Sequence, residues 1–250
     1  FLIMGSCYST SVATPEPKGS TTSTNPNPVV EKTLDEAEKE VTIAKKDRAC
    51  FGAGCYWGTE KFFYYDFGKK NTTGAITDGA VGFMGPEDAP VDPTYAEVKG
   101  GYTRHVEVYE FEYSGGLAYY EALVRFFFEM HDPTTLKRQG NDVGTQYASV
   151  IFCYTDEQVA IATKVKTELQ LALDAGKLEC YENRIVTTDI RKATVFYPAH
   201  KEHQDYLTVN PTGYCNHRIR FKEWPSTEQA ETVSANDTTT AVAANKPTEQ

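Results

Sequence analysis

The chain has 250 residues, of which 40% are hydrophobic and 12% aromatic, so it can bury one sizeable core. Its formal net charge of −10 does not favour a nucleic-acid-binding protein held by phosphate contacts. No run of apolar residues approaches the roughly 18 that a membrane-spanning helix needs, and we expect no membrane span.

Both ends of the chain are polar and low in complexity. Residues 8–30 are rich in Ser, Thr, Pro and Asn, and the stretch after residue 225 is similar. Such segments cannot bury a core. We therefore predict a disordered or processed extension over 1–47, a folded domain over 48–224 and a disordered tail over 225–250.

The opening letters FLIMGSC are consistent with the end of a targeting segment, and Cys7 loosely resembles a lipoprotein cleavage site. The sequence does not identify the compartment, although a cytoplasmic or organellar location is expected. The six cysteines form no regular disulfide framework. Cys50 and Cys153 lie in apolar, strand-like runs, whereas only Cys55 and Cys215 have glycine-containing, loop-like surroundings, which indicates selective thiol chemistry.

Hydrophobic periodicity predicts mixed secondary structure within the domain. The expected elements, in chain order, are a strand over 48–54, the start of a helix over 59–67, a strand over 105–113, a helix over 117–130, a strand over 146–154, a helix from a Thr155–Gln158 capping box to Gly176, strands over 184–190 and 193–197, and a short helix over 200–207. These elements do not alternate as βαβ units. We predict an α+β fold, a two-layer sandwich with a mixed central sheet flanked by helices.

Cys55 lies in GAGCYWGTEKFF, after a predicted strand and a glycine turn and directly before a predicted helix. The partial positive charge of a helix N-terminus stabilises a thiolate, which predicts a lowered pKa for Cys55. The glycines allow a sharp bend and close approach of a substrate. Tyr56 and Trp57 suggest an apolar pocket beside the thiol. The alternative is a small residue that fills a strand–helix corner.

Glu107 shares one face of its predicted strand with Tyr109, Phe111 and Tyr113. A carboxyl on an aromatic face is desolvated, which raises its pKa and lets it hold a proton near neutrality. Taken alone, an exposed glutamate on an edge strand is the simpler interpretation.

Four further residues are ambiguous by themselves. Asp142 and Tyr147 belong to a tight turn before a strand, and Tyr95 follows a proline-containing turn. Cys215 lies in the loop NPTGYCNHR near the end of the domain, a position that suits a resolving thiol that must travel. An ordinary free cysteine is the alternative.

The motif GAGCYWGTEKFF resembles the GCFWG signature of the A-type peptide methionine sulfoxide reductases. The segments PTYAEVKGGYTRHVEV, HDPTTLKRQGNDVGTQYASVIF, TTDIRKATVFYPAHKEHQDYL and NPTGYCNHR follow in the order of that family. The resemblance covers roughly residues 48–221 and implies an α+β sandwich around a mixed sheet, with a ferredoxin-like core.

The resemblance also implies a role for each residue of the site. It assigns Cys55 as the nucleophile, Glu107 as the proton donor to the sulfoxide oxygen and Cys215 as the resolving cysteine. The substrate-binding residues that it implies are Tyr95 and Tyr147 for the oxygen, Tyr56 and Trp57 for the methyl group, and Asp142 in the network on the oxygen side.

The implied reaction converts the S epimer of methionine sulfoxide, free or in proteins, to methionine. It leaves a sulfenic acid on Cys55, then a Cys55–Cys215 disulfide that thioredoxin or a similar dithiol reduces. We expect a monomer that needs no cofactor and no metal. Three departures from the family pattern stand out: Tyr56 replaces the usual Phe, His200 stands where an acid is common, and no cysteine follows Cys215.

Two other functions remain open at this stage. One is a different thiol enzyme, either a peroxidase or a Cys–His hydrolase whose base would lie within hydrogen-bond reach of Cys55. The other is a metal-binding module built from His200, His203, Cys215 and His217, although their spacing matches no known zinc pattern.

Overall fold

The computed structural model describes residues 47–225. The predictions for the two terminal extensions, including those for Cys7, concern residues outside this range. Within it, no helix combines the length and the apolar character that crossing a membrane requires.

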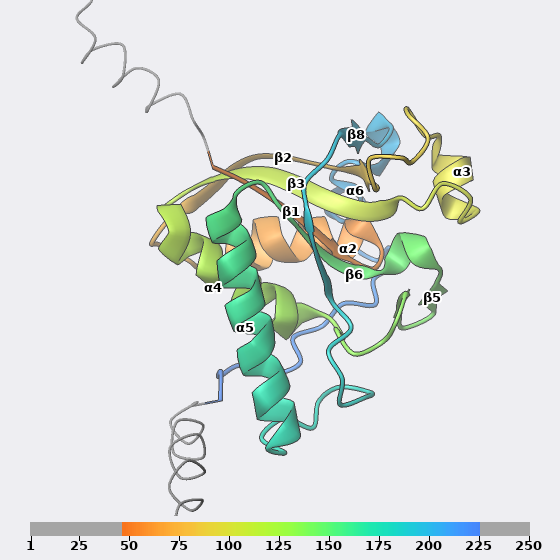
Figure 1. Cartoon of the computed structure of the whole chain (residues 1–250). Coiled ribbons are helices and arrows are strands. Elements are labelled where there is room, and N and C mark those ends of the chain that lie inside the picture. The colour runs from red at the N-terminus through yellow and green to blue at the C-terminus, as the bar shows by residue number, and fades with distance from the viewer. Residues whose placement is uncertain (1–46, 226–250) are drawn as a thin grey trace, which may run out of the picture. The chain divides into compact units, whose positions relative to one another are not determined.

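A mixed sheet is the centre of the described part of the chain (Figure 1). Its strands lie in the order β7 (Asp189–Lys192), β6 (Ser149–Cys153), β1 (Asp47–Ala53), β3 (Val106–Ser114), β2 (Ala75–Met84) and β8 (Phe196–Pro198). Neighbouring strands are antiparallel except β6 and β7, which are parallel. A separate two-stranded ribbon pairs β4 (Arg138–Gln139) with β5 (Asp142–Val143).

The helices connect these strands. They are α2 (Tyr56–Lys61), α3 (Tyr95–Lys99), α4 (Gly116–Met130), α5 (Asp156–Asp174) and α6 (Tyr206–Val209). Shorter turns are the π-helical η1 (Phe62–Phe67), which continues α2, and the 3₁₀ turns η2 (Thr145–Tyr147) and η3 (Lys201–His203).

The order β1–α2–β2–β3–α4–β6 along the chain, combined with the spatial order β6–β1–β3–β2, is the ferredoxin-like arrangement. Helix α5 then returns the chain so that β7 pairs parallel to β6. The predicted α+β fold, with a mixed sheet and a ferredoxin-like core, is confirmed.

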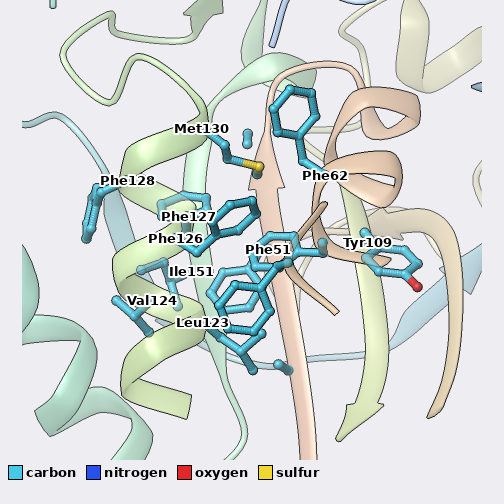
Figure 2. Close-up of a cluster of buried hydrophobic side chains, with 14 of the residues drawn as sticks. Phe51, Phe62, Tyr109, Leu123, Val124, Phe126, Phe127, Phe128, Met130 and Ile151 are labelled. Carbon is cyan, nitrogen blue, oxygen red and sulfur yellow. The ribbon is translucent and has the colours of Figure 1, made fainter. Parts of the chain in front are cut away.

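The main hydrophobic core fills the space between the sheet and helices α2, α4 and α5. Leu123 and Phe127 of α4 point toward Phe51 on β1, and the rings of Phe51 and Phe127 stack with centroids 5.3 Å apart (Figure 2). Each fully buried side chain of this size contributes roughly 1.5–3 kcal/mol. The apolar stripe expected from the helical period of α4 is therefore the stripe that holds this helix against the sheet.

Strand β3 confirms the alternation expected from its sequence. Tyr109, Phe111 and Tyr113 belong to the main core, whereas Val106 and Val108 belong to a smaller cluster on the other face. Period two therefore predicts correctly which face of the sheet carries Glu107.

Five predicted elements differ from the structure. The helix start expected over 59–67 begins earlier, at Tyr56, and the chain is π-helical from Phe62 to Phe67. The strand expected over 193–197 begins only at Phe196. The strand expected over 146–154 begins only at Ser149, because the preceding residues form η2. The strand expected over 184–190 is irregular up to Asp189. The helix expected over 200–207 is interrupted by Gln204, which is extended, and by Asp205, which has a positive φ of 52°. Gln204 instead hydrogen-bonds the backbone of Val81, which is a tertiary contact that local periodicity does not report.

Candidate active site

Cys55 is the N-cap residue of α2, immediately after β1 ends. Gly54 turns the chain with a φ of 97°, a region that side-chain-bearing residues rarely adopt. A Cβ at Gly54 would also lie 2.5 Å from Cβ of Gln139. The glycine therefore allows both the bend and the close packing of the 139–142 segment against the corner. The Cys55 side chain is buried there, with 8% of the residue exposed.

Gly58 has a packing role that the sequence did not reveal. A Cβ at this position would lie 2.0 Å from Nδ1 of His217. The other ring nitrogen of His217, Nε2, lies 2.8 Å from the carbonyl oxygen of Ala53. Gly58 therefore leaves room for the buried ring of His217, which comes from the end of the domain. The substrate access predicted for the glycines does not explain why residue 58 is a glycine.

The lowered pKa predicted for Cys55 is wrong in direction. Burial raises the pKa of the thiol, and the charge that Glu107 carries once ionised raises it further. The backbone N–H groups of Trp57 and Gly58 lower the pKa, as a helix N-terminus should, but they are outweighed. Without substrate, Cys55 is therefore a thiol rather than a free thiolate.

Glu107 lies on β3 with 2% of its surface exposed. Its Oε2 accepts a hydrogen bond from the backbone N–H of Tyr56 at 3.1 Å, which places the carboxyl beside the residue that follows Cys55. Burial raises the pKa of Glu107 to about 8, although the Tyr56 N–H and the charge of Lys99 act in the opposite direction. Glu107 is thus a protonated carboxylic acid at neutral pH and lies close to Cys55.

Two tyrosine hydroxyls belong to the same electrostatic neighbourhood. Tyr95 begins α3, behind a capping box formed by Thr94 and Glu97, and Tyr147 ends η2. Burial raises the pKa of both hydroxyls, and the charges that Glu107, Asp142 and Cys55 carry once ionised raise it further. Both hydroxyls therefore keep their protons at neutral pH and can donate hydrogen bonds.

Asp142 belongs to β5 and is half-buried. Burial raises the pKa of its carboxyl, while hydrogen bonds with Tyr214 and Asn216 lower it. Its charge in turn raises the pKa of Cys55 and Glu107. The fold thus brings together residues that were predicted from separate segments, namely Cys55, Tyr95, Glu107, Asp142 and Tyr147.

An aromatic cluster borders this group. Trp57 stacks on Tyr206 with ring centroids 3.8 Å apart. The ring of His203 contacts those of Tyr56, Trp57 and Tyr95 at centroid distances of 4.5–5.8 Å. Tyr56 is 1% exposed, and its buried hydroxyl has no hydrogen-bond partner among residues 47–225. The sequence suggested His203 only as a ligand of the alternative metal-binding module and did not reveal its contact with three predicted pocket residues.

Cys215 is exposed, unlike Cys55. It lines a hollow of about 520 Å³ together with Cys180, Gly140 and Arg220. Its loop, expected to be mobile, is fixed on its C-terminal side, because Asn216 and His217 both make hydrogen bonds to other segments. Movement of Cys215 must therefore come from the residues that precede it.

A sequence model described as peptide methionine sulfoxide reductase matches residues 47–234. The chain belongs to the peptide methionine sulfoxide reductase family. It is 42% identical over 169 residues to the reductase MsrA of Methanoculleus marisnigri, which covers 68% of this chain and 93% of the relative. It is 40% identical over 175 residues to a probable reductase of Schizosaccharomyces pombe, which covers 69% and 96%.

Solved structures agree with this assignment. The reduced form of Mxr1 from Saccharomyces cerevisiae superimposes with a TM-score of 0.59 at 34% identity, over 71% of this chain and 94% of that one. The methionine sulfoxide reductase A of Corynebacterium diphtheriae gives a TM-score of 0.57 at 34% identity, over 69% and 78%. The family predicted from the motifs is confirmed.

The metal-binding module and the Cys–His hydrolase have no support in the described part of this reductase-family chain. Over residues 47–225, no three His, Cys, Asp or Glu side chains gather closely enough to hold a metal ion, so the four residues of the alternative metal module do not form one. No hydrogen bond joins a histidine to Cys55 in this range, since His217 is engaged with Ala53 and His131 with Phe127 and Ser149. The base that a Cys–His hydrolase needs is therefore not in place.

Proposed function

We propose that this chain reduces the S epimer of methionine sulfoxide, free or in proteins, to methionine, with Cys55 as the nucleophile and Glu107 as the acid. The observation that carries the proposal is the buried carboxyl of Glu107, bonded to the backbone N–H directly after Cys55 and with a pKa of about 8. Reduction of a sulfoxide needs a proton at its oxygen, and this carboxyl holds one at neutral pH beside the thiol.

In the first step, Sγ of Cys55 attacks the sulfoxide sulfur while Glu107 protonates the oxygen. The new S–S bond joins Cys55 to the substrate sulfur, which now carries a hydroxyl group. This hydroxyl moves to Sγ of Cys55 as the S–S bond breaks, so that methionine leaves and Cys55 becomes a sulfenic acid. The proton lost by the thiol replaces the one that Glu107 gives up. The thiol is oxidised by two electrons, and the sulfoxide is reduced by two.

The surrounding side chains suit the two ends of the substrate. Tyr95 and Tyr147 retain their protons and would donate hydrogen bonds to the sulfoxide oxygen, with Asp142 in the same network. Tyr56 and Trp57 would bound the space for the methyl group. A chiral sulfur with oxygen donors on one side and rings on the other accommodates one epimer, which is assigned as S by the family resemblance.

In the second step, the thiol of Cys215 attacks Sγ of Cys55. The S–S bond forms, and the oxygen leaves as water with the remaining proton. Thioredoxin or a similar dithiol would then reduce the Cys55–Cys215 disulfide by exchange. Because Cys215 is exposed and Cys55 is buried, the two segments must approach each other before this bond can form.

The test compares the two epimers of methionine sulfoxide with wild type, Cys55→Ser and Cys180→Ser in the presence of dithiothreitol. Wild type and Cys180→Ser should convert the S epimer and leave the R epimer, and Cys55→Ser should convert neither. Cys180→Ser is the matched control because it also removes a thiol, but one outside the catalytic corner. Retained turnover by Cys55→Ser would contradict the proposal.

A further inference from the structure

The side-chain amide of Asn216 joins the Cys215 segment to the loop beside the nucleophile. Its Nδ2 donates hydrogen bonds to Oδ2 of Asp142 at 2.8 Å and to the carbonyl oxygen of Gln139 at 2.5 Å. Both acceptors belong to the segment that packs on Gly54, the residue before Cys55. Asn216 is the next residue after Cys215, so its amide fixes the backbone on one side of the proposed resolving thiol.

The next residue makes a second attachment. His217 is buried between Ala53 and Gly58, one on each side of Cys55 along the chain. The attachment through His217 is set by burial of a ring, whereas the attachment through Asn216 is two hydrogen bonds at a half-buried surface. Loss of the Asn216 amide therefore frees the backbone nearest Cys215 while His217 still holds the segment on the domain.

We propose that Asn216 is a positioning residue for the resolving step: through Asp142 and Gln139 it holds Cys215 where it can reach the oxidised Cys55. The inference rests on the proposed function and adds a residue to its second half-reaction. A disulfide requires the two Cα atoms to lie within about 7 Å and constrains the direction of both Cβ atoms. Two hydrogen bonds one residue away limit the region that Cys215 can sample while the residues before it move, which raises the effective concentration of its thiol at Cys55.

An uncharged amide that donates hydrogen bonds is suited to this position. Asp142 offers a carboxylate, and Gln139 offers a carbonyl, so both acceptors need a donor that carries no acidic group of its own. A carboxyl at position 216 would place two acids about 2.8 Å apart, where they cannot both ionise without repulsion.

The first experiment separates the two half-reactions in rapid-quench reactions without external reductant, starting from fully reduced protein. Methionine formed reports the first step, and the Cys55–Cys215 disulfide, followed by peptide mass mapping, reports the second. In Asn216→Ala the first step should remain within about twofold of wild type, and disulfide formation should slow tenfold or more. The unresolved sulfenic acid should then accumulate and be trapped by a dimedone-type reagent.

Asn210→Ala is the matched control. Its amide lies in the same segment, but it donates to the carbonyl oxygen of Tyr206 within its own turn. It should resolve at the wild-type rate. Disulfide formation at the wild-type rate in Asn216→Ala, or an equal slowing of both steps, would overturn the inference. Absence of methionine formation in wild type would instead refute the proposed function, so the two failures are distinguishable.

Asn216→Asp supplies a second measurement that does not depend on the folding of the alanine variant. At pH 8 the paired carboxylates repel and the resolving step should be slow, whereas at pH 5 a shared proton restores a hydrogen bond to Asp142. The ratio of the variant's resolving rate to that of wild type should therefore rise at least fivefold as the pH falls.

The other titratable groups around Asp142 are common to both proteins and cancel in this ratio; they are Cys55, Tyr95, Glu107, Tyr147 and Tyr214. A ratio that does not change with pH would mean that position 216 does not act through Asp142, and the inference would fail.

Discussion

Replacing Glu107 by glutamine should slow the chemical step far more than it weakens substrate binding. Glutamine keeps the size of the side chain, and its amide oxygen can still accept the hydrogen bond that the Tyr56 N–H makes at 3.1 Å. It can also donate a hydrogen bond to the sulfoxide oxygen. What it lacks is a proton that it can give up as the S–O bond breaks.

The size of the effect follows from the protonation state. With a pKa of about 8, roughly 90% of the Glu107 carboxyl is protonated at pH 7, so nearly all of the wild type carries the acid. Removal of a positioned general acid typically costs about 100- to 10,000-fold. The expected loss is therefore at least about 100-fold at pH 7, with little change in the substrate concentration that gives half the maximal rate.

The assay is the single-turnover rate of methionine formation at saturating substrate. Glu129→Gln is the control, because burial also raises the pKa of this carboxyl, to about 7, but its partner is the indole N–H of Trp224. The wild-type rate should fall above pH 8 as Glu107 loses its proton. A loss of less than threefold in Glu107→Gln would leave this residue with a structural role, and a wild-type rate that rises through pH 8 would make a thiolate the reactive form.

Four further results are expected. Cys215→Ser should form about one methionine per chain and then stall with thioredoxin; undiminished cycling would make another thiol, such as Cys180, the resolver. Removal of residues 1–30 and 226–250 should leave the rate of the catalysed reaction unchanged, because the composition of these segments does not support packing; a folded but inactive shortened chain would refute this. Tyr56→Phe should raise the free energy of unfolding by about 1 kcal/mol, since it removes a buried hydroxyl without a partner; a loss of stability in urea unfolding would show that the hydroxyl is bonded. The folded protein holds the Glu107 proton more tightly than the unfolded chain, so wild-type stability should decline relative to Glu107→Gln as the pH rises from about 4.5 to 8, by up to about 5 kcal/mol; parallel pH profiles for the two proteins would contradict the raised pKa.

The sequence predicted most of what depends on local pattern. The alternation of β3 placed Glu107 on the aromatic face, and the stripe of α4 identified the residues that pack on Phe51. The glycine turn and the helix start located Cys55 at its corner. The ordered motifs added the family and with it the residues of the other segments.

Properties that depend on contacts between distant parts of the chain could not be predicted from the sequence. A helix start alone lowers a thiol pKa, but burial and the charge of Glu107 reverse the sign at Cys55, and both arise from residues that the fold brings in. Gly58 is explained only by a histidine 159 positions later in the chain, and the anchoring of the Cys215 loop depends on Asn216 contacts with the 139–142 segment. A single sequence shows which residues can react. The burial and the neighbouring charges that set their pKa values are known only from the tertiary structure.

The most direct test of the central claim follows the oxygen atom itself. Reduced Cys215→Ser is mixed with methionine S-sulfoxide labelled with oxygen-18, without external reductant, and the mass of the Cys55 peptide is measured. Because Cys55 is proposed to take the oxygen from the substrate, its peptide should gain one oxygen-18 atom for each methionine released. Release of methionine with the label absent from Cys55, or present on another residue, would contradict the account.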